Sequence, residues 1–238
     1  MNFKFDIVIY VLIICLIASF SLVSANDVST ADDNCTSFNE DEISVYCNGS
    51  MDDNSLLSVE GDEILSEGEA SFSDLNEKIK DGGSVELRGN YKYDDNVDSP
   101  NGIIISKNLI LDGKNYTIDA NGKARVFIIS DGVDVKLKNV NFVNAYCSDN
   151  GAVIKNNGRL TIEDCTFTDN SNHMGETIYS GGVIYSAGSI LSVVDSKFIS
   201  NKAAYGGAIY SSTNNTLISN CNFTGNYAYS KGGGCLSG

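Results

Sequence analysis

The chain has 238 residues, and its 31 acidic against 16 basic side chains give a net charge of −15. This length suits one domain or two small ones, and a hydrophobic fraction of 42% is enough to fill a core. Nucleic-acid binding is not expected, because contact with the phosphate backbone needs clustered Lys and Arg. A single proline beside 23 glycines excludes collagen, and a single histidine, His173, excludes a metal site built from several histidines.

Residues 1–25 have the pattern of a secretory signal peptide. An uncharged, almost wholly apolar run covers residues 7–20, and Ser24 and Ala25 fit a cleavage site. An uncleaved membrane anchor is the alternative, but this run is shorter than the ~20 residues that cross a bilayer. We therefore expect cleavage after Ala25 and a mature protein that is secreted or held at the cell surface, where disulfides and glycans form.

Residues 26–70 form a strongly acidic segment, with 13 Asp and Glu and no Lys or Arg. The segment has few aromatic residues and no hydrophobic periodicity, so we expect a disordered, solvated leader. Cation binding is the alternative, although no Asp-x-Asp-x-Asp-Gly calcium loop occurs there. A disulfide between Cys35 and Cys47 would close a loop within this leader.

A short amphipathic helix is predicted where the leader ends. Phe72, Leu75 and Ile79 fall on one helical stripe, and Ser71 with Asp74 has the spacing of a capping box. A single helix before a long β region is expected to cover one end of that region.

The main signal in residues 71–238 is an internal repeat. In each of four copies a phenylalanine ends a short alternating strand, an asparagine follows two or three residues later, and a glycine then precedes a small apolar strand. The phenylalanines lie 25, 31 and 25 residues apart, and the longer interval coincides with extra residues near 172–180. The four phenylalanines are Phe142, Phe167, Phe198 and Phe223, and the four asparagines are Asn144, Asn170, Asn201 and Asn226.

A period near 25 residues without helices indicates a parallel β-solenoid, in which strands of successive coils stack at about 4.8 Å. Equivalent residues then lie above one another. We expect the phenylalanines to form a ladder in the core, and the asparagines to take left-handed turns and to bond from coil to coil. The predicted fold class is all-β, a parallel β-helix with a short N-terminal capping helix.

The same stacking constrains the cysteines of the repeat. Cys165 and Cys221 share one column but lie two coils apart, about 10 Å, which exceeds the ~7 Å limit for a disulfide. We expect them to be inert, buried side chains, and we expect the same of Cys235, which takes the position of Ala208. No metal or other cofactor is predicted.

The repeat pattern at residues 198–210 resembles the right-handed parallel β-helix of the pectin-lyase-like superfamily. It resembles more closely the adhesin-like surface proteins of methanogenic archaea, which share a leading helix like that at 72–79 and a segment like that at 85–91. It is also similar to the polymorphic outer-membrane proteins of Chlamydia. The resemblance implies a right-handed coil and a place at the cell surface, and it brings no functional residue with it.

We expect an adhesin-like, non-catalytic protein that attaches to glycans or proteins on the surface of other cells, because a rigid stack of coils adds many weak contacts together. A structural stalk without a ligand predicts the same repeat. The chain stops within a repeat, which would leave a bare strand edge, so we expect a longer protein with a wall or membrane tether in its missing C-terminal part. Six tyrosines near the glycine turns are candidates for stacking on sugars: Tyr179, Tyr185, Tyr205, Tyr210, Tyr227 and Tyr229.

A polysaccharide lyase or hydrolase is the third interpretation, since hydrolysis of a glycosidic bond needs two carboxylates on either side of it. Turn formation and solvation explain the candidate acidic residues equally well, and fold alone does not license an activity. The candidates are Asp131, Asp134, Asp149, Asp164 and Asp169, with Lys155 and Arg159 nearby in the sequence.

Five Asn-x-Ser/Thr triplets are acceptors for N-linked glycans in an exported protein. We expect glycosylation mainly at Asn34, Asn48 and Asn214. Asn222 is not favoured, because it directly precedes Phe223, which the repeat places in the core. The fifth triplet begins at Asn115.

Overall fold

A computed structural model describes residues 43–45, 69–172, 178–230 and 233–237, all within one compact unit, Asp33–Gly238. The predicted signal peptide, most of the acidic leader, the Cys35–Cys47 disulfide and the glycosylation sites Asn34 and Asn48 lie outside the described residues. They stay predictions.

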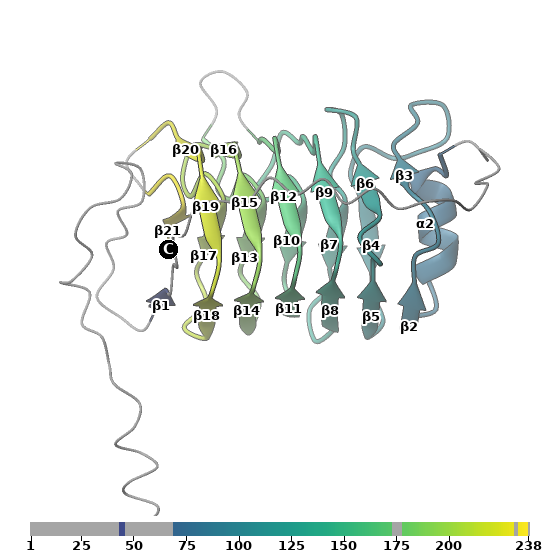
Figure 1. Cartoon of the computed structure of the whole chain (residues 1–238), viewed down its shortest axis with the longest axis horizontal. Coiled ribbons are helices and arrows are strands. Elements are labelled where there is room, and N and C mark those ends of the chain that lie inside the picture. Colours follow the sequence, from purple (N-terminus) through teal and green to yellow (C-terminus); the bar gives the residue numbers. More distant parts are fainter. Residues whose placement is uncertain (1–42, 46–68, 173–177, 231–232, 238) are drawn as a thin grey trace, which may run out of the picture. The chain divides into compact units, whose positions relative to one another are not determined.

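The helix α2 (Phe72–Ile79) has the capping box that the sequence predicts, and Phe72, Leu75 and Ile79 are buried. The Asp98 carboxylate completes its N-terminus by accepting the backbone N–H groups of Phe72 at 3.0 Å and Ser73 at 2.7 Å. Free N–H groups at a helix start need such acceptors. The helix lies at the end of the stack where the first coils are found (Figure 1).

Each coil contributes one strand to each of three parallel sheets (Figure 1). Sheet 1 contains, in spatial order, β1 (Ile43–Val45), β18 (Thr216–Ser219), β14 (Ile190–Val194), β11 (Arg159–Glu163), β8 (Asp134–Lys138), β5 (Leu109–Asp112) and β2 (Gly83–Glu86). Sheet 2 contains β19 (Asn222–Thr224), β15 (Lys197–Ile199), β12 (Thr166–Thr168), β9 (Asn141–Val143), β6 (Thr117–Asp119) and β3 (Tyr91–Lys92). Sheet 3 contains β21 (Leu236–Ser237), β17 (Ile209–Ser211), β13 (Ile184–Ser186), β10 (Ile154–Asn156), β7 (Phe127–Ile129) and β4 (Ile103–Ile105). A two-stranded sheet joins β16 (Lys202–Ala203) to β20 (Tyr227–Ala228).

The predicted all-β parallel solenoid with a short N-terminal helix is confirmed. Because side chains alternate across a strand, every second residue of sheet 1 faces the core and its neighbours face outward. The extra residues of the longer repeat interval lie between Ser171 and Ser180, since these residues pair with Lys202 and Tyr205 of the next coil.

The four phenylalanines of the repeat stack in the core. Ring centroids are 5.1 Å apart between Phe142 and Phe167, and 4.8 Å apart both between Phe167 and Phe198 and between Phe198 and Phe223. The rings are nearly parallel, with interplanar angles of 7° to 11°. Phe127 closes the stack at its other end with an edge-to-face contact to Phe142.

A buried ladder of amides runs beside this stack. The Asn170 side-chain NH₂ donates to Asn201 Oδ1 at 2.9 Å, and the Asn201 NH₂ donates to Asn226 Oδ1 at 2.8 Å. Asn144 lies outside this ladder, and Ala145 takes the ladder position, donating its backbone N–H to Asn170 Oδ1. The exposed Asn144 side chain instead donates to Asp119 Oδ1 of the neighbouring coil at 3.1 Å, so it does bond from coil to coil as expected. The shorter spacing from Phe142 to Asn144 already indicates its place outside the ladder.

The left-handed turns fall on residues just before the ladder, and not on the ladder asparagines themselves. Asn144, Asp169 and Ser200 have φ of 54°, 55° and 56°, and Gly225 takes the same place. Asn and Asp tolerate this conformation and Gly adopts it without penalty. The sequence thus located the turns correctly to within one residue.

The cysteines of the repeat follow the prediction in part. No disulfide joins Cys165 to Cys221, and burial raises the pKa of the Cys165 thiol to about 12, which keeps it protonated and unreactive. Cys235 is buried as expected, but it is disulfide-bonded and not the free thiol of the prediction.

Candidate ligand-binding groove

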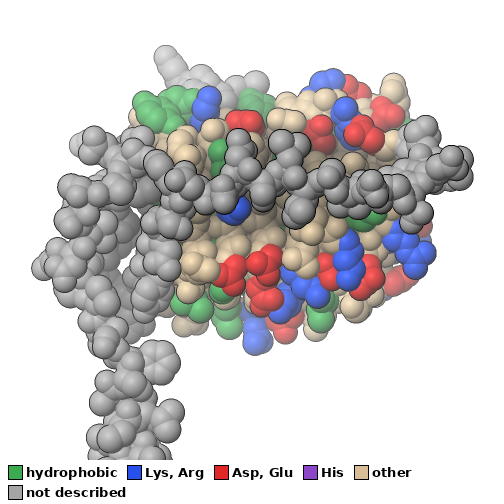
Figure 2. All heavy atoms as spheres, viewed as in Figure 1, with side chains coloured by type: hydrophobic (Ala, Val, Ile, Leu, Met, Phe, Trp, Pro, Cys, Tyr) green, Lys and Arg blue, Asp and Glu red, His purple; other side chains and the backbone are tan. Residues whose placement is uncertain are grey.

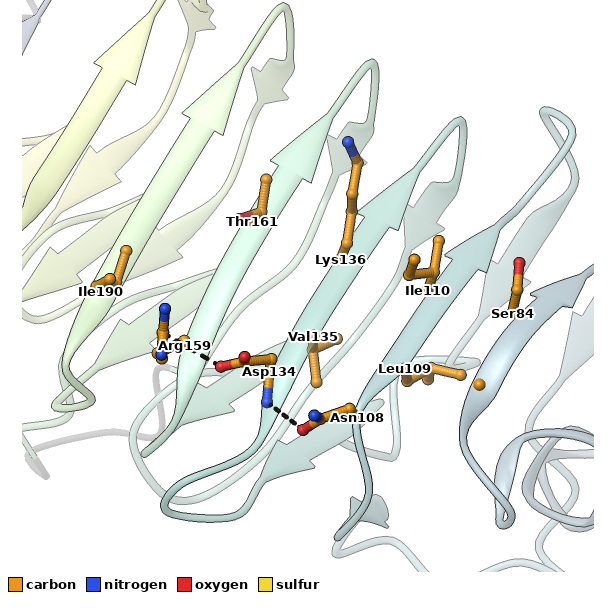
Figure 3. A pocket seen from close by; sticks show the side chains of 11 residues that line it. Ser84, Asn108, Leu109, Ile110, Asp134, Val135, Lys136, Arg159, Thr161 and Ile190 are labelled. Carbon is orange, nitrogen blue, oxygen red and sulfur yellow. Dashed lines mark hydrogen bonds and ion pairs between the residues drawn. The ribbon is translucent and has the colours of Figure 1, made fainter.

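A shallow groove of about 570 Å³ crosses the outer face of sheet 1 (Figure 3). Its residues occupy equivalent positions on the successive strands β2, β5, β8, β11 and β14, so the groove runs along the stack. The lining side chains are Ser84, Asn108, Leu109, Ile110, Asp134, Val135, Lys136, Arg159, Thr161 and Ile190, with the backbone of Gly83.

The middle row of the groove combines an apolar centre with short polar side chains. Ile110 is 45% exposed, and in the register of the sheet it lies between Ser84 and Lys136, with Thr161 next along the row. Ile110 lies between the buried residues Leu109 and Leu111, so alternation directs its side chain outward. An exposed isoleucine in the centre of a sheet face adds nothing to the core and is available to a ligand.

The charged side chains of the groove are held in ion pairs, one beside this row and one that begins at Lys136 within it. Arg159 Nε lies 3.2 Å from Asp134 Oδ1, and Lys136 Nζ lies 2.7 Å from Glu163 Oε1. Acidic and basic side chains lie next to each other over the strands of sheet 1 (Figure 2). The groove therefore has nearly balanced charge and presents hydrogen-bond donors and acceptors around an apolar centre.

This arrangement suits an uncharged, elongated, polyhydroxylated ligand better than an ionic one. The Asn108 carboxamide oxygen accepts the Asp134 N–H at 2.9 Å, which orders the border of the groove before any ligand binds (Figure 3). A preordered site loses less entropy on binding. The groove is open rather than enclosed, so affinity has to come from several contacts along its length.

The acidic residues considered for catalysis lie at separate places. Asp164 and Asp169 take left-handed turn positions, with φ of 51° and 55°, and both are exposed. Asp131 is also exposed in a turn, next to Gly132. Asp134 pairs with Arg159 in the groove. Turn formation therefore accounts for Asp164 and Asp169.

Asp149 belongs to a second ionic group, on the loop between β9 and β10. Its Oδ2 atom lies 3.0 Å from Arg125 Nη2 and 2.8 Å from Lys155 Nζ. Burial alone would raise the pKa of Asp149, but hydrogen bonds from Lys155 and the Asn150 backbone, with the charges of Lys155 and Arg125, hold it below its usual value. Arg125 is only 5% exposed and also donates to Gly151 O at 2.9 Å, so the group fixes the loop.

Four of the six candidate tyrosines form two pairs. Tyr185 and Tyr210 stack on each other with ring centroids 5.4 Å apart, so their facing surfaces are covered by packing. Tyr227 and Tyr229 are 53% and 44% exposed and meet edge to face at 4.8 Å. Hydrophobic side chains gather over the region of β16 and β20 (Figure 2). Sugar stacking is therefore better supported at Tyr227 than at Tyr185 or Tyr210.

Neither a cluster of metal ligands nor a membrane-spanning helix occurs in the described residues. Within residues 69–172, 178–230 and 233–237, no three His, Cys, Asp or Glu side chains gather as metal ligands would. Across the same part of the chain, no helix has the length and apolar character needed to span a membrane.

The fold defines this protein as a parallel β-solenoid repeat protein with an open groove on one sheet. Its residues 195–212 match the Chlamydia polymorphic membrane protein repeat, which confirms the predicted similarity to those proteins over this segment. The matched segment begins directly after β14 and covers β15, β16 and β17, so it contains Phe198, Asn201 and the turn glycines of one coil. No curated protein and no solved structure matches the chain.

Proposed function

We propose that this protein is an exported, adhesin-like surface protein that attaches to neutral glycans of other cells through the groove on sheet 1, without catalysis. The observation that carries the proposal is the groove itself, in which the exposed Ile110 lies among polar side chains and the charged side chains Asp134, Arg159 and Lys136 are held in ion pairs. Weak contacts along such a groove add up when a ligand is itself a repeating chain.

The similarity of residues 195–212 to the Chlamydia polymorphic membrane protein repeat supports a place at the cell surface. The apolar segment at residues 7–20 supports export.

Retention of the whole chain on cells tests the proposal. We expect saturable retention that falls when soluble neutral polysaccharide is added and is unchanged by a uronate polymer at the same concentration. Retention that is competed only by the uronate polymer would contradict a groove with balanced charge.

Two variants connect the retention to the groove. Ile110→Glu replaces the apolar side chain of the groove with a carboxylate beside Lys136 and is expected to weaken retention about tenfold, which corresponds to ~1.4 kcal/mol. Ile104→Glu is the matched control, because Ile104 is 64% exposed at the outward position of β4 on sheet 3. Equal loss in both variants would contradict binding at sheet 1.

The alternative functions give different results in the same assays. A structural stalk shows no saturable retention on any cell or glycan. A polysaccharide lyase or hydrolase releases unsaturated products or new reducing ends from a polymer, and Asp134→Asn would then abolish that release.

A further inference from the structure

The described part of the chain carries three Asn-x-Thr triplets, and the structure separates them by how each is presented. Alternation along β19 directs Phe223 toward the core and turns Asn222 and Thr224 outward, and both are exposed. The sequence-based argument against Asn222 was therefore wrong, because a residue next to a core residue on a strand points to the opposite face.

We propose that Asn222 is a site of N-linked glycosylation in the folded protein. The Thr224 hydroxyl donates to Asn222 Oδ1 at 2.9 Å, so the hydroxyl that the acceptor triplet requires lies directly beside the acceptor amide on the protein surface. The proposal depends on export of the chain and is independent of the groove on sheet 1.

Asn214 is presented differently, although its own side chain is also exposed. Its triplet ends at Thr216, which is only 7% exposed and whose hydroxyl lies 2.7 Å from Ser211 Oγ and donates to Thr213 O at 3.2 Å. A transferase cannot reach this hydroxyl unless the coil opens. We therefore expect Asn214 to receive a glycan only while the chain is unfolded, and not after it has folded.

Asn115 is held in a tight turn. Its φ is 65°, its backbone N–H donates to Asn139 O at 2.8 Å, and its carbonyl accepts the Asn141 side chain at 2.7 Å. The backbone at this triplet is thus bonded to the next coil on both sides of the acceptor residue. We expect no transfer to Asn115 in the folded protein.

The donor is a lipid-phosphate-linked oligosaccharide. In the transfer, a bond forms between Asn222 Nδ2 and the anomeric carbon of the first sugar, and the bond between that carbon and the phosphate oxygen breaks. The amide nitrogen loses one proton, and the lipid phosphate leaves with the bonding electron pair.

The test is transfer to the folded full chain by an oligosaccharyltransferase with its lipid-linked donor, measured by intact mass. Every chain in the test carries Asn34→Gln and Asn48→Gln, because the triplets of the predicted disordered leader are also expected acceptors. On this background we expect one glycan on the otherwise wild-type chain and on Asn214→Gln, and none on Asn222→Gln. The variants are needed because tryptic cleavage after Lys202 and Lys231 leaves Asn214 and Asn222 in one peptide.

A denatured sample of the same chain is the control for the transferase. There we expect glycans at Asn214 as well as at Asn222, since Thr216 is then accessible. A folded wild type without a glycan, or a folded Asn222→Gln that still gains one, would overturn the proposal. Circular dichroism spectra of the variants matching that of the wild type exclude misfolding as the cause.

Discussion

At the scale of single residues, the coils are joined by buried side chains that form hydrogen bonds to the coils on either side. Asn201 is fully buried, donates to Phe167 O at 3.1 Å and to Asn226 Oδ1 at 2.8 Å, and accepts the Asn170 N–H at 3.0 Å. A buried polar group that loses its partners keeps its full desolvation cost. The ladder is therefore sensitive to any change at one of its members.

Replacing Asn201 with Ala is expected to lower the free energy of unfolding by about 3 kcal/mol, because it leaves groups on both neighbouring coils without partners. Urea unfolding measures the loss. Asn144→Gly is the matched control, since Asn144 is exposed at a left-handed position that glycine adopts easily, and we expect a change below about 0.5 kcal/mol there. A similar loss in both variants would contradict the distinction between ladder and turn.

Asp112 gives the fold a dependence on pH. Burial by itself raises the pKa of this carboxyl, which is 5% exposed, but hydrogen bonds from the Asn139 side chain, the Lys114 backbone and the side chains of Lys114 and Lys138 hold the pKa well below its usual range. A carboxyl with a lowered folded-state pKa contributes stability above its unfolded pKa, about 3.9, and loses it as the pH falls below that value.

We therefore expect the Asp112→Asn variant to have a lower free energy of unfolding than the wild type, by an amount that stays constant between pH 5 and 7. The difference is expected to shrink as the pH falls below about 4, because the Asp112 carboxyl of the unfolded wild-type chain then binds a proton that the folded chain still excludes. Urea unfolding at a series of pH values measures it. A difference that grows on acidification would contradict a lowered pKa.

At the scale of strands and turns, glycines set how closely successive coils approach. A Cβ atom on Gly182 would collide with the carbonyl oxygen of Gly207 and would also meet Lys202 O at 2.7 Å. Both obstacles are backbone atoms of the next coil, so they cannot move away as a flexible side chain would.

We expect Gly182→Ala to destabilise the fold by at least about 2 kcal/mol, because the two coils have to separate locally. Gly89→Ala is the matched control, since a Cβ on Gly89 meets no atom within 4 Å and its φ is not in the left-handed region. Thermal unfolding of the two variants is the measurement. An unchanged melting temperature in Gly182→Ala would show that the coils are less tightly stacked than the structure has them.

The elements differ in how well the sequence predicts them. The helix α2 is predicted residue by residue, because its stripe and its capping box are local signals. The phenylalanine stack also follows from the repeat alone, since register in a solenoid copies the period of the sequence. The place of Asn144 outside the buried ladder was missed, because it depends on one residue of offset between neighbouring coils. The exposure of Asn222 was misjudged, although alternation along the strand already indicates it.

At the scale of the whole described solenoid, stacking converts a repeat in the sequence into rows on the surface. The groove was missed in the sequence because its members, such as Ser84, Ile110 and Lys136, share no residue type and lie one coil, or 26 residues, apart. The available signal was the apolar residue Ile110 between two core residues on a strand, which alternation turns outward. A sequence motif does not show residues that lie this far apart in the chain and differ in chemical type.

The central claim is that a neutral glycan binds in the groove on sheet 1. Calorimetric titration of the full chain with a neutral oligosaccharide, in the wild type, in Ile110→Glu and in Ile104→Glu, tests it most directly. The account predicts a saturable isotherm for the wild type and for Ile104→Glu, and about tenfold weaker binding for Ile110→Glu. Equal affinity in all three proteins, or no binding by a wild type that is shown to be folded, would contradict it.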